Sequence, residues 1–244
     1  TANYCIMFPE DYLEIIGIVD RNQDTNGLDV FLEEGEGGLG LAFRSEDVKQ
    51  SAACLAKQGV NVDGPNILRR ILELEHGDVM PSFELLRYDT NVTPGIASFV
   101  CDHKTPDIVW QAPWLEHPNG AMGVKRVVYV TDNPSDMIAD YSRSFGGGNV
   151  FVTDGCIDIT LENKEHTLRL ITPEDVSRFY PGLEAQETGR DSYMLAFHLW
   201  SDDLAATQAY FDQYRVEYHK EGDSCLRLNK NDACSVVISF DAKL

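Results

Sequence analysis

The sequence predicts an α+β fold in which repeated βαβββ units form two curved mixed sheets. Three observations support this prediction. A strand followed by a helix recurs three times, three short strands follow each of these helices, and the first residues look like the last two strands of a further unit. We therefore predict four units in two pseudo-symmetric halves, with the first unit truncated at its N-terminus.

Each strand and helix pair carries the same local signals. In the first pair, an apolar strand at 38–44 leads into a helix at 45–59, which starts at the potential capping residue Ser45 and stops at Gly59. The apolar residues of this helix recur at helical spacing. The equivalent pairs are the strand at 124–130 with the helix at 134–148, and the strand at 193–200 with the helix at 201–215.

Three short strands, joined by turns, follow each helix. Alternating apolar residues and turn residues such as Asp-Gly and Asn-Lys are typical of an antiparallel meander. The predicted strands are 60–65, 81–89 and 96–103 in the first complete unit, 149–154, 156–162 and 166–172 in the next, and 216–222, 224–229 and 234–241 in the last. The first complete unit also carries an insertion around 66–80.

Residues 1–20 match the end of a unit. The segments TANYCIMF and DYLEIIGIVD flank a Pro-Glu turn, and YLEIIG corresponds to TLRLIT of the middle unit. By comparison with that unit, on the order of 30 residues with a strand, a helix and a second strand are missing. We expect the open sheet edge to be relieved by pairing into a homodimer or by fraying.

Composition and charge restrict the function classes. The length of 244 residues allows two halves, which we place at 1–116 and 117–244. The composition, with 43% hydrophobic and 25% charged residues, is typical of globular proteins. With 20 basic and 40 acidic residues the net charge is -20, which argues against nucleic acid and anionic membranes as partners. The sequence holds no apolar run long enough to span a membrane, and TANYCIMFPE does not resemble a signal peptide, so we expect a cytoplasmic protein. Six isolated cysteines suit buried thiols in such a reducing compartment.

The paired βαβββ units resemble the vicinal oxygen chelate superfamily, and three segments are similar to its glyoxalase-like branch. These are TANYCIMFPEDYLEIIGIVD, FVCDHKTPDIVW and HPNGA at 117–121. The resemblance covers essentially the whole chain and implies two clefts, a small-molecule substrate and a divalent metal. In the family, His or Gln of first strands and Glu of last strands hold the metal, which binds two neighbouring substrate oxygens. Lyases, isomerases, dioxygenases, epimerases and drug-binding proteins share this scaffold, so it does not select the reaction.

The ligand pattern that the resemblance implies assigns Glu14 as the catalytic and metal-binding carboxylate of the first cleft. His103, on the last strand of the second unit, is the other expected metal ligand. Cys101 lies on the same face of that strand, and we interpret it as a core residue. The alternatives are a solvent-facing carboxylate for Glu14 and a hydrogen-bonded surface histidine for His103. Two ligands are too few, so we expect a divalent metal in the full-length protein and none in the chain as given.

In the second cleft the equivalent positions carry arginines. Arg126 and Arg169 fall on ligand positions of the third unit, where they would repel a cation and could instead bind the carboxylate or phosphate of a substrate. The alternative is that each forms an ion pair with one of the many acids. In the last unit the ligand positions of the first and last strands carry residues that do not bind metal well. Alternation along the strand places His198 on the face opposite to Phe197, so we interpret it as a structural histidine.

These observations predict a small-molecule enzyme of the vicinal oxygen chelate type, with lyase, isomerase or dioxygenase chemistry on a substrate with adjacent oxygens. The alternative is a metal-free protein that binds or sequesters a small molecule. A scaffold that only dimerises is a third option.

Overall fold

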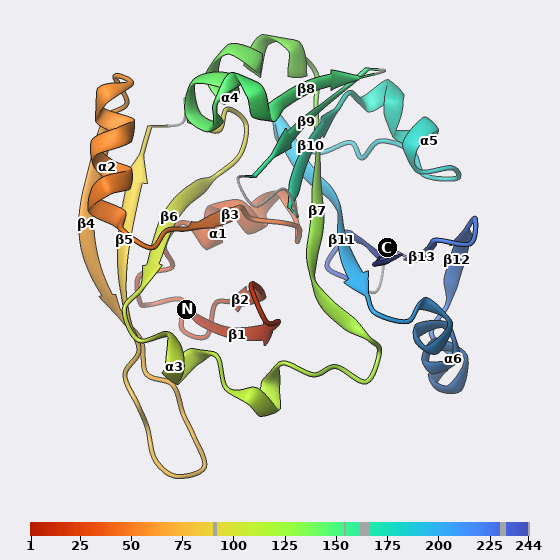
Figure 1. Cartoon of the computed structure of the whole chain (residues 1–244), viewed down its shortest axis with the longest axis horizontal. Helices are drawn as coiled ribbons and strands as arrows, with labels where there is room; N and C mark the ends of the chain where they lie inside the picture. The colour runs from red at the N-terminus through yellow and green to blue at the C-terminus, as the bar shows by residue number, and fades with distance from the viewer. Residues whose placement is uncertain (90–91, 154, 162–165, 230–232, 244) are drawn as a thin grey trace.

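A computed structural model describes residues 1–244 except 90–91, 154, 162–165, 230–232 and 244 (Figure 1). The described strands form an eight-stranded sheet, a four-stranded sheet and a two-stranded hairpin. In Figure 1 the hairpin lies between the two larger sheets, and β7 and β11 run side by side through the middle.

The eight-stranded sheet contains the last two units. One consists of β7 (Ala121–Thr131), η3 (Pro134–Met137), α4 (Ile138–Phe145), η4 (Gly147–Asn149), β8 (Val150–Thr153), β9 (Cys156–Thr160) and β10 (Thr167–Ile171). The other consists of β11 (Ser192–Ser201), α6 (Leu204–Tyr214), β12 (Tyr218–Glu221), β13 (Cys225–Leu228) and β14 (Val237–Ala242). The strand order is β12-β13-β14-β11-β7-β10-β9-β8, with β11 antiparallel to β7 at the junction of the two units.

The four-stranded sheet contains the preceding unit and repeats the same topology. Its elements are β3 (Leu41–Arg44), α2 (Val48–Lys57), β4 (Val62–Arg69), β5 (Ser82–Tyr88) and β6 (Ser98–His103), with the order β3-β6-β5-β4. In all three units the first strand pairs in parallel with the last strand, as β3 with β6, β7 with β10 and β11 with β14. The predicted α+β class and the equivalence of the three first strands are confirmed.

The hairpin of β1 (Ala2–Met7) and β2 (Tyr12–Gly17) is antiparallel, as expected for the last two strands of a unit. The insertion around 66–80 extends β4 to Arg69 and continues as a long turn with a bridge between Leu72 and Val79. Short helical turns fill the connections: α1 (Leu28–Phe31), η1 (Leu32–Glu34), α3 (Pro106–Val109), η2 (Ala112–Trp114), η5 (Pro173–Asp175) and α5 (Val176–Phe179). Within the described part of the chain, no helix is long and apolar enough to cross a membrane.

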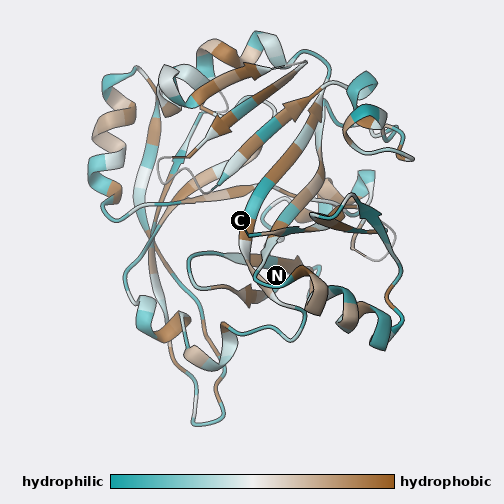
Figure 2. Cartoon of the chain, turned by 45° about the vertical axis from the view of Figure 1, so that its right-hand side comes forward, coloured by the Kyte–Doolittle hydropathy of each residue, from teal (hydrophilic) through white to brown (hydrophobic). Residues whose placement is uncertain are grey.

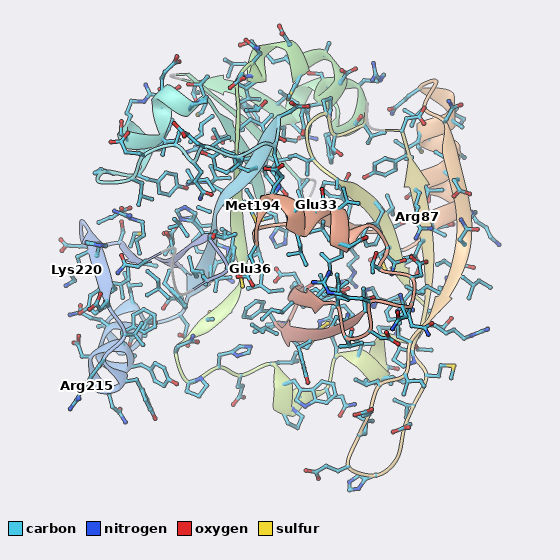
Figure 3. The ribbon with its side chains drawn as sticks, turned by 180° about the vertical axis from the view of Figure 1, so that it is seen from behind. Glu33, Glu36, Arg87, Met194, Arg215 and Lys220 are labelled. Atoms are coloured by element: carbon cyan, nitrogen blue, oxygen red, sulfur yellow. The ribbon has the colours of Figure 1, made fainter. Side chains whose placement is uncertain are left out.

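The segment before β3 packs on the large sheet. A Cβ on Gly38 would lie 2.4 Å from the Met194 sulfur of β11, so this position requires glycine. Figure 3 shows Met194 beside the segment that carries Glu33 and Glu36, and Arg190 donates hydrogen bonds to the Phe31 and Gly35 carbonyls. The predicted strand at 38–44 therefore begins only at Leu41, because residues 38–40 contact other elements.

The two faces of the large sheet have different cover. Its outer face carries Tyr129 and Phe240 and packs against α4 and α6. Its inner face carries Val128 and Val237 and packs against the connector between β10 and β11, which contributes Val176 and other apolar residues. Figure 2 shows the hydrophobic residues along these central strands.

The cysteines and one helix cap differ from the sequence-based expectation. All six thiols are free, and three of them, Cys5, Cys54 and Cys234, are exposed rather than buried. The cap of α2 is Asp47, whose carboxylate accepts hydrogen bonds from the Lys49 and Gln50 amides, whereas Ser45 accepts from the Asp47 amide. The equivalent cap of α6 is Asp203.

Asp203→Ala should lower the free energy of unfolding by about 1 kcal/mol, because it removes the acceptor for two otherwise unpaired amides at the start of α6. Asp203→Asn keeps an acceptor oxygen and should cost clearly less. Urea unfolding monitored by circular dichroism measures both variants. Equal losses in the two variants would show that the cap does not act through this hydrogen bonding.

Candidate functional site

Aromatic rings surround His103 where the hairpin meets the four-stranded sheet. The ring centroids of Phe83 and Trp110 lie 4.8 Å from that of His103, and Tyr12 of β2 lies 5.8 Å away. Trp110 also donates a hydrogen bond of 2.9 Å to the Phe8 carbonyl, which fixes the hairpin beside the sheet. We call Tyr12, Phe83, His103 and Trp110, with Arg44 of β3, the His103 cluster.

The imidazole of His103 is neutral and incompletely paired. Among the described residues its Nδ1 atom is buried without a hydrogen-bond partner, and Nε2 lies 3.5 Å from the Tyr12 hydroxyl, at the limit of a hydrogen bond. Burial, followed by the positive charge of Arg44, lowers the pKa of His103 to about 4, against the opposing effect of Asp102. A neutral imidazole with an unused nitrogen can accept a proton or bind a metal.

Glu14 lies on the same strand face as Tyr12, because side chains two residues apart on a strand share a face. Its side chain is exposed and accepts a hydrogen bond from Asn3. Burial, then Asp102 and the charge of Glu14, raises the pKa of Cys101 to about 12, so that thiol is neutral and behaves as the predicted core residue. Glu14 is therefore exposed, as expected if it is a solvent-facing carboxylate. It also lies on the face of the hairpin that contacts His103.

Arg44 was not singled out from the sequence. Its guanidinium lies 6.0 Å from the Trp110 ring centroid and 3.6 Å from the Glu10 carboxylate, and its side chain is 58% exposed. A lone arginine at the end of a short strand has no distinctive sequence signal, and only the fold brings it to His103. It gives the cluster a positive charge that an anionic substrate group could use.

The donors for a divalent metal in the first cleft are few. Among the described residues, one set of three histidine, cysteine or acidic side chains brings its ligand atoms within 4.8 Å of one another, and it consists of His198, Cys225 and Asp241. Glu14 and His103 have no third such donor there. A stable site needs at least three protein ligands, so this pair alone does not fit a tightly bound divalent metal.

In the second cleft, Arg169 and Arg126 differ. Arg169 forms a bidentate ion pair with Asp158, with distances of 2.7 Å from Nε to Oδ1 and 2.6 Å from Nη2 to Oδ2. This is the ion pair that the sequence left open as the alternative. Arg126 has a buried Nε without a partner in the described part of the chain, and its charge opposes the strong burial effect that raises the pKa of Tyr180.

His198 lies on the inner face, although alternation along its strand predicted otherwise. The pairing of β11 with β7 skips Leu195, since Met194 faces Tyr129 and Ala196 faces Val128. This bulge reverses the parity and brings His198 next to Asp241, with 3.2 Å between Nδ1 and Oδ2. Its Nε2 lies 2.9 Å from the Tyr180 hydroxyl. Hydrogen bonds from His198 and Lys125 outweigh burial and hold the pKa of Asp241 well below its usual range.

Comparison with known proteins assigns the family. The model of the glyoxalase-like domain family matches residues 1–145. The chain belongs to the glyoxalase-like domain family. The predicted resemblance to the vicinal oxygen chelate superfamily is thereby confirmed. The matched residues include the hairpin, the four-stranded sheet and the whole His103 cluster, and they end before β11.

Two solved structures were compared with the chain, both at low sequence identity. A hypothetical protein from Staphylococcus aureus is 12% identical with a TM-score of 0.67, covering 99% of this chain and 85% of that one. Methylmalonyl-CoA epimerase from Mycobacterium tuberculosis is 15% identical with a TM-score of 0.40, covering 55% of this chain and 96% of that one. No curated protein matches the sequence. The first similarity supports the glyoxalase-like fold over nearly the whole chain.

The His103 imidazole should stay neutral to well below pH 5 in an NMR titration, with a midpoint near the pKa of about 4. Arg44→Gln should raise this midpoint, because it removes a positive charge that disfavours the imidazolium. Since the ordinary value is 6.5, His103 should lower stability as pH falls from 6.5 to 4, where the unfolded chain binds the proton first. A midpoint near 6.5 in both proteins would contradict the burial of this ring.

Proposed function

We propose that the protein is a small-molecule enzyme of the vicinal oxygen chelate type whose catalytic centre is the His103 cluster. The supporting observation is the neutral imidazole of His103, whose Nδ1 has no partner in the described part of the chain and which aromatic rings enclose inside the residues that match the family. Enzyme sites often combine an apolar wall with a titratable group whose pKa is strongly shifted.

The residues of the cluster suit removal of a proton from carbon. Isomerase and lyase reactions on a substrate with neighbouring oxygens begin with such a step, in which negative charge develops on one oxygen. His103 would accept the proton at a ring nitrogen, Arg44 would stabilise the developing oxyanion, and the aromatic rings would exclude water. Glu14 would serve as a second acid or base at the open side of the cluster.

The divalent metal that the resemblance implies would be held by Glu14 and His103 and would need at least one further donor. If bound, such a metal polarises neighbouring substrate oxygens. The proton transfer assigned to His103 uses only this chain's own residues.

Deuterium exchange tests this proposal. In D₂O, with and without added Mn²⁺, the protein should exchange the carbon-bound proton of at least one compound in a panel of 2-hydroxyketones and 2-oxo acids, read by NMR. His103→Asn should slow the exchange roughly 100-fold or more, because it removes the base. His76→Asn, at an exposed histidine in the 70–81 turn, is the matched control and should leave the rate unchanged.

A protein that binds compounds of the panel without exchanging their protons would favour the second candidate, a metal-free binding or sequestering protein. The buried Nε of Arg126, which has no partner among the described residues, is the observation that supports this candidate, since a guanidinium in such a place suits a carboxylate or phosphate. Arg169 would join Arg126 in holding the anion only after release from Asp158.

Three further features are part of the proposal. Residues 1–116 and 117–244 form the first and second glyoxalase-like halves, the protein works in the cytoplasm, and two copies associate as a homodimer. Exposed apolar side chains on the hairpin support the association, since Tyr4 is 80% and Ile15 54% exposed.

A further inference from the structure

An apolar cavity of about 280 Å³ lies on the outer face of the large sheet, where the hairpin meets α6. The hairpin contributes Ile6, Phe8 and Leu13 to its wall, and α6 contributes Phe211. Strands β7, β11, β13 and β14 supply the floor, which includes the buried ring of Phe240. Ile6 is 37% exposed, so the cavity opens to solvent beside the hairpin.

The hairpin separates this cavity from the His103 cluster. Ile6 and Leu13 are direct cross-strand partners and share one face of the hairpin. Tyr12, the preceding residue of β2, lies on the opposite face, where its ring contacts His103. On β11, His198 lies on the inner face, whereas its two neighbours line the cavity. The cavity is therefore distinct from both clefts that carry the predicted site residues.

Aromatic rings form much of the cavity wall. Five of the fourteen lining residues are phenylalanine or tyrosine. Apolar cavities hold water poorly, and an engineered apolar cavity of about 150 Å³ binds benzene. A cavity of roughly twice that volume suits a molecule with two fused aromatic rings. Such a molecule would contact the aromatic side chains edge to face or in offset stacks.

His117 and Asn119 give the cavity one polar side. The Nε2 atom of His117 donates a hydrogen bond of 2.7 Å to the Met7 carbonyl, because a carbonyl oxygen only accepts. Oδ1 of Asn119 accepts from the Ala121 amide at 3.2 Å. Within the described part of the chain, these two side chains form no other hydrogen bond, so Nδ1 of His117 and Nδ2 of Asn119 are available to a ligand.

Charge favours a hydroxyl group over a carboxylate at this polar side. The chain has a net charge of -20, and no lysine or arginine lines the cavity among the residues described. A carboxylate buried there without a cation would lose its hydration without compensation. A hydroxyl group, in contrast, can donate to Nδ1 of His117 and accept from Nδ2 of Asn119.

We propose that this cavity binds a small, uncharged aromatic alcohol or phenol of about the size of a naphthol. The fused rings pack between the hairpin, α6 and the sheet, and the hydroxyl group pairs with His117 and Asn119. Because the ligand contacts both the hairpin and the large sheet, it holds the hairpin in place. The site does not depend on the catalytic role proposed for His103.

Titration of the intact chain with 2-naphthol, followed by calorimetry, tests the ligand class. The protein should bind one equivalent. Naphthalene, which lacks the hydroxyl group, should bind roughly 2- to 10-fold more weakly. The anion 2-naphthoate should bind more weakly than 2-naphthol, because its carboxylate finds no cation. His117→Phe keeps a ring but removes both nitrogens, so the preference for 2-naphthol over naphthalene should decrease.

Two matched variants of the hairpin test the location. Ile6→Trp should weaken 2-naphthol binding roughly tenfold or more, because the larger side chain fills the cavity from its open side. Ile15→Trp introduces the same residue on the same face of the hairpin but outside the cavity, and it should bind 2-naphthol like the wild type. If Ile6→Trp does not fold, as judged by circular dichroism, Ala121→Leu fills the cavity from its floor and should have the same effect.

A wild-type protein that shows no saturable binding of 2-naphthol, or a folded cavity-filling variant that binds it normally, would overturn the proposal. Tighter binding of 2-naphthoate than of 2-naphthol would contradict the ligand class. Loss of binding in Ile15→Trp would place the ligand on the exposed hairpin surface, and loss in His103→Asn would place it in the His103 cluster; either result would also overturn the proposal. None of these results changes the exchange assay of His103, so the two proposals are tested separately.

Discussion

The antiparallel pairing of β7 with β11 is the interaction on which the C-terminal half of the structure depends. Each of these strands also pairs in parallel with the last strand of its own unit, so the two units become one sheet of eight strands. Val128 and Ala196 face each other across this junction and are fully buried. The same pairing aligns Arg126, His198 and Ser239 in one row across the inner face. The polar chemistry of that face therefore depends on the backbone register at the junction.

The hairpin depends on this sheet in turn. The Asp11 carboxylate accepts a hydrogen bond from the Val124 amide of β7 at 3.1 Å, although burial raises the pKa of Asp11 to about 6. On the other side, Trp110 holds the Phe8 carbonyl. These two contacts fix the hairpin between the halves and place Tyr12 against His103. The catalytic centre proposed for the first cleft thus rests on contacts with both halves of the molecule.

Period-two and helical patterns predicted the units, their order and the equivalence of the three first strands, because these features follow from local burial repeated three times. Contacts distant in sequence explain what the patterns missed. The bulge at Leu195 reverses the parity of β11 and turns His198 inward, and no residue type marks such a bulge. At α2, Ser45 and Asp47 are both suitable caps, and the backbone path selects the latter. The ion pair of Arg169 depends on its direct opposition to Asp158 in the folded sheet.

Native-state hydrogen exchange, followed residue by residue, most directly tests the central role of the β7 and β11 junction. If the rest of the C-terminal half depends on this pairing, the amides of β7 and β11 should exchange slowest, with the protection of global unfolding. The hairpin should exchange much faster, since β1 and β2 pair only with each other among the described strands. Amides of β7 and β11 that exchange before those of β8 or β12, at the edges of the same sheet, would contradict this account.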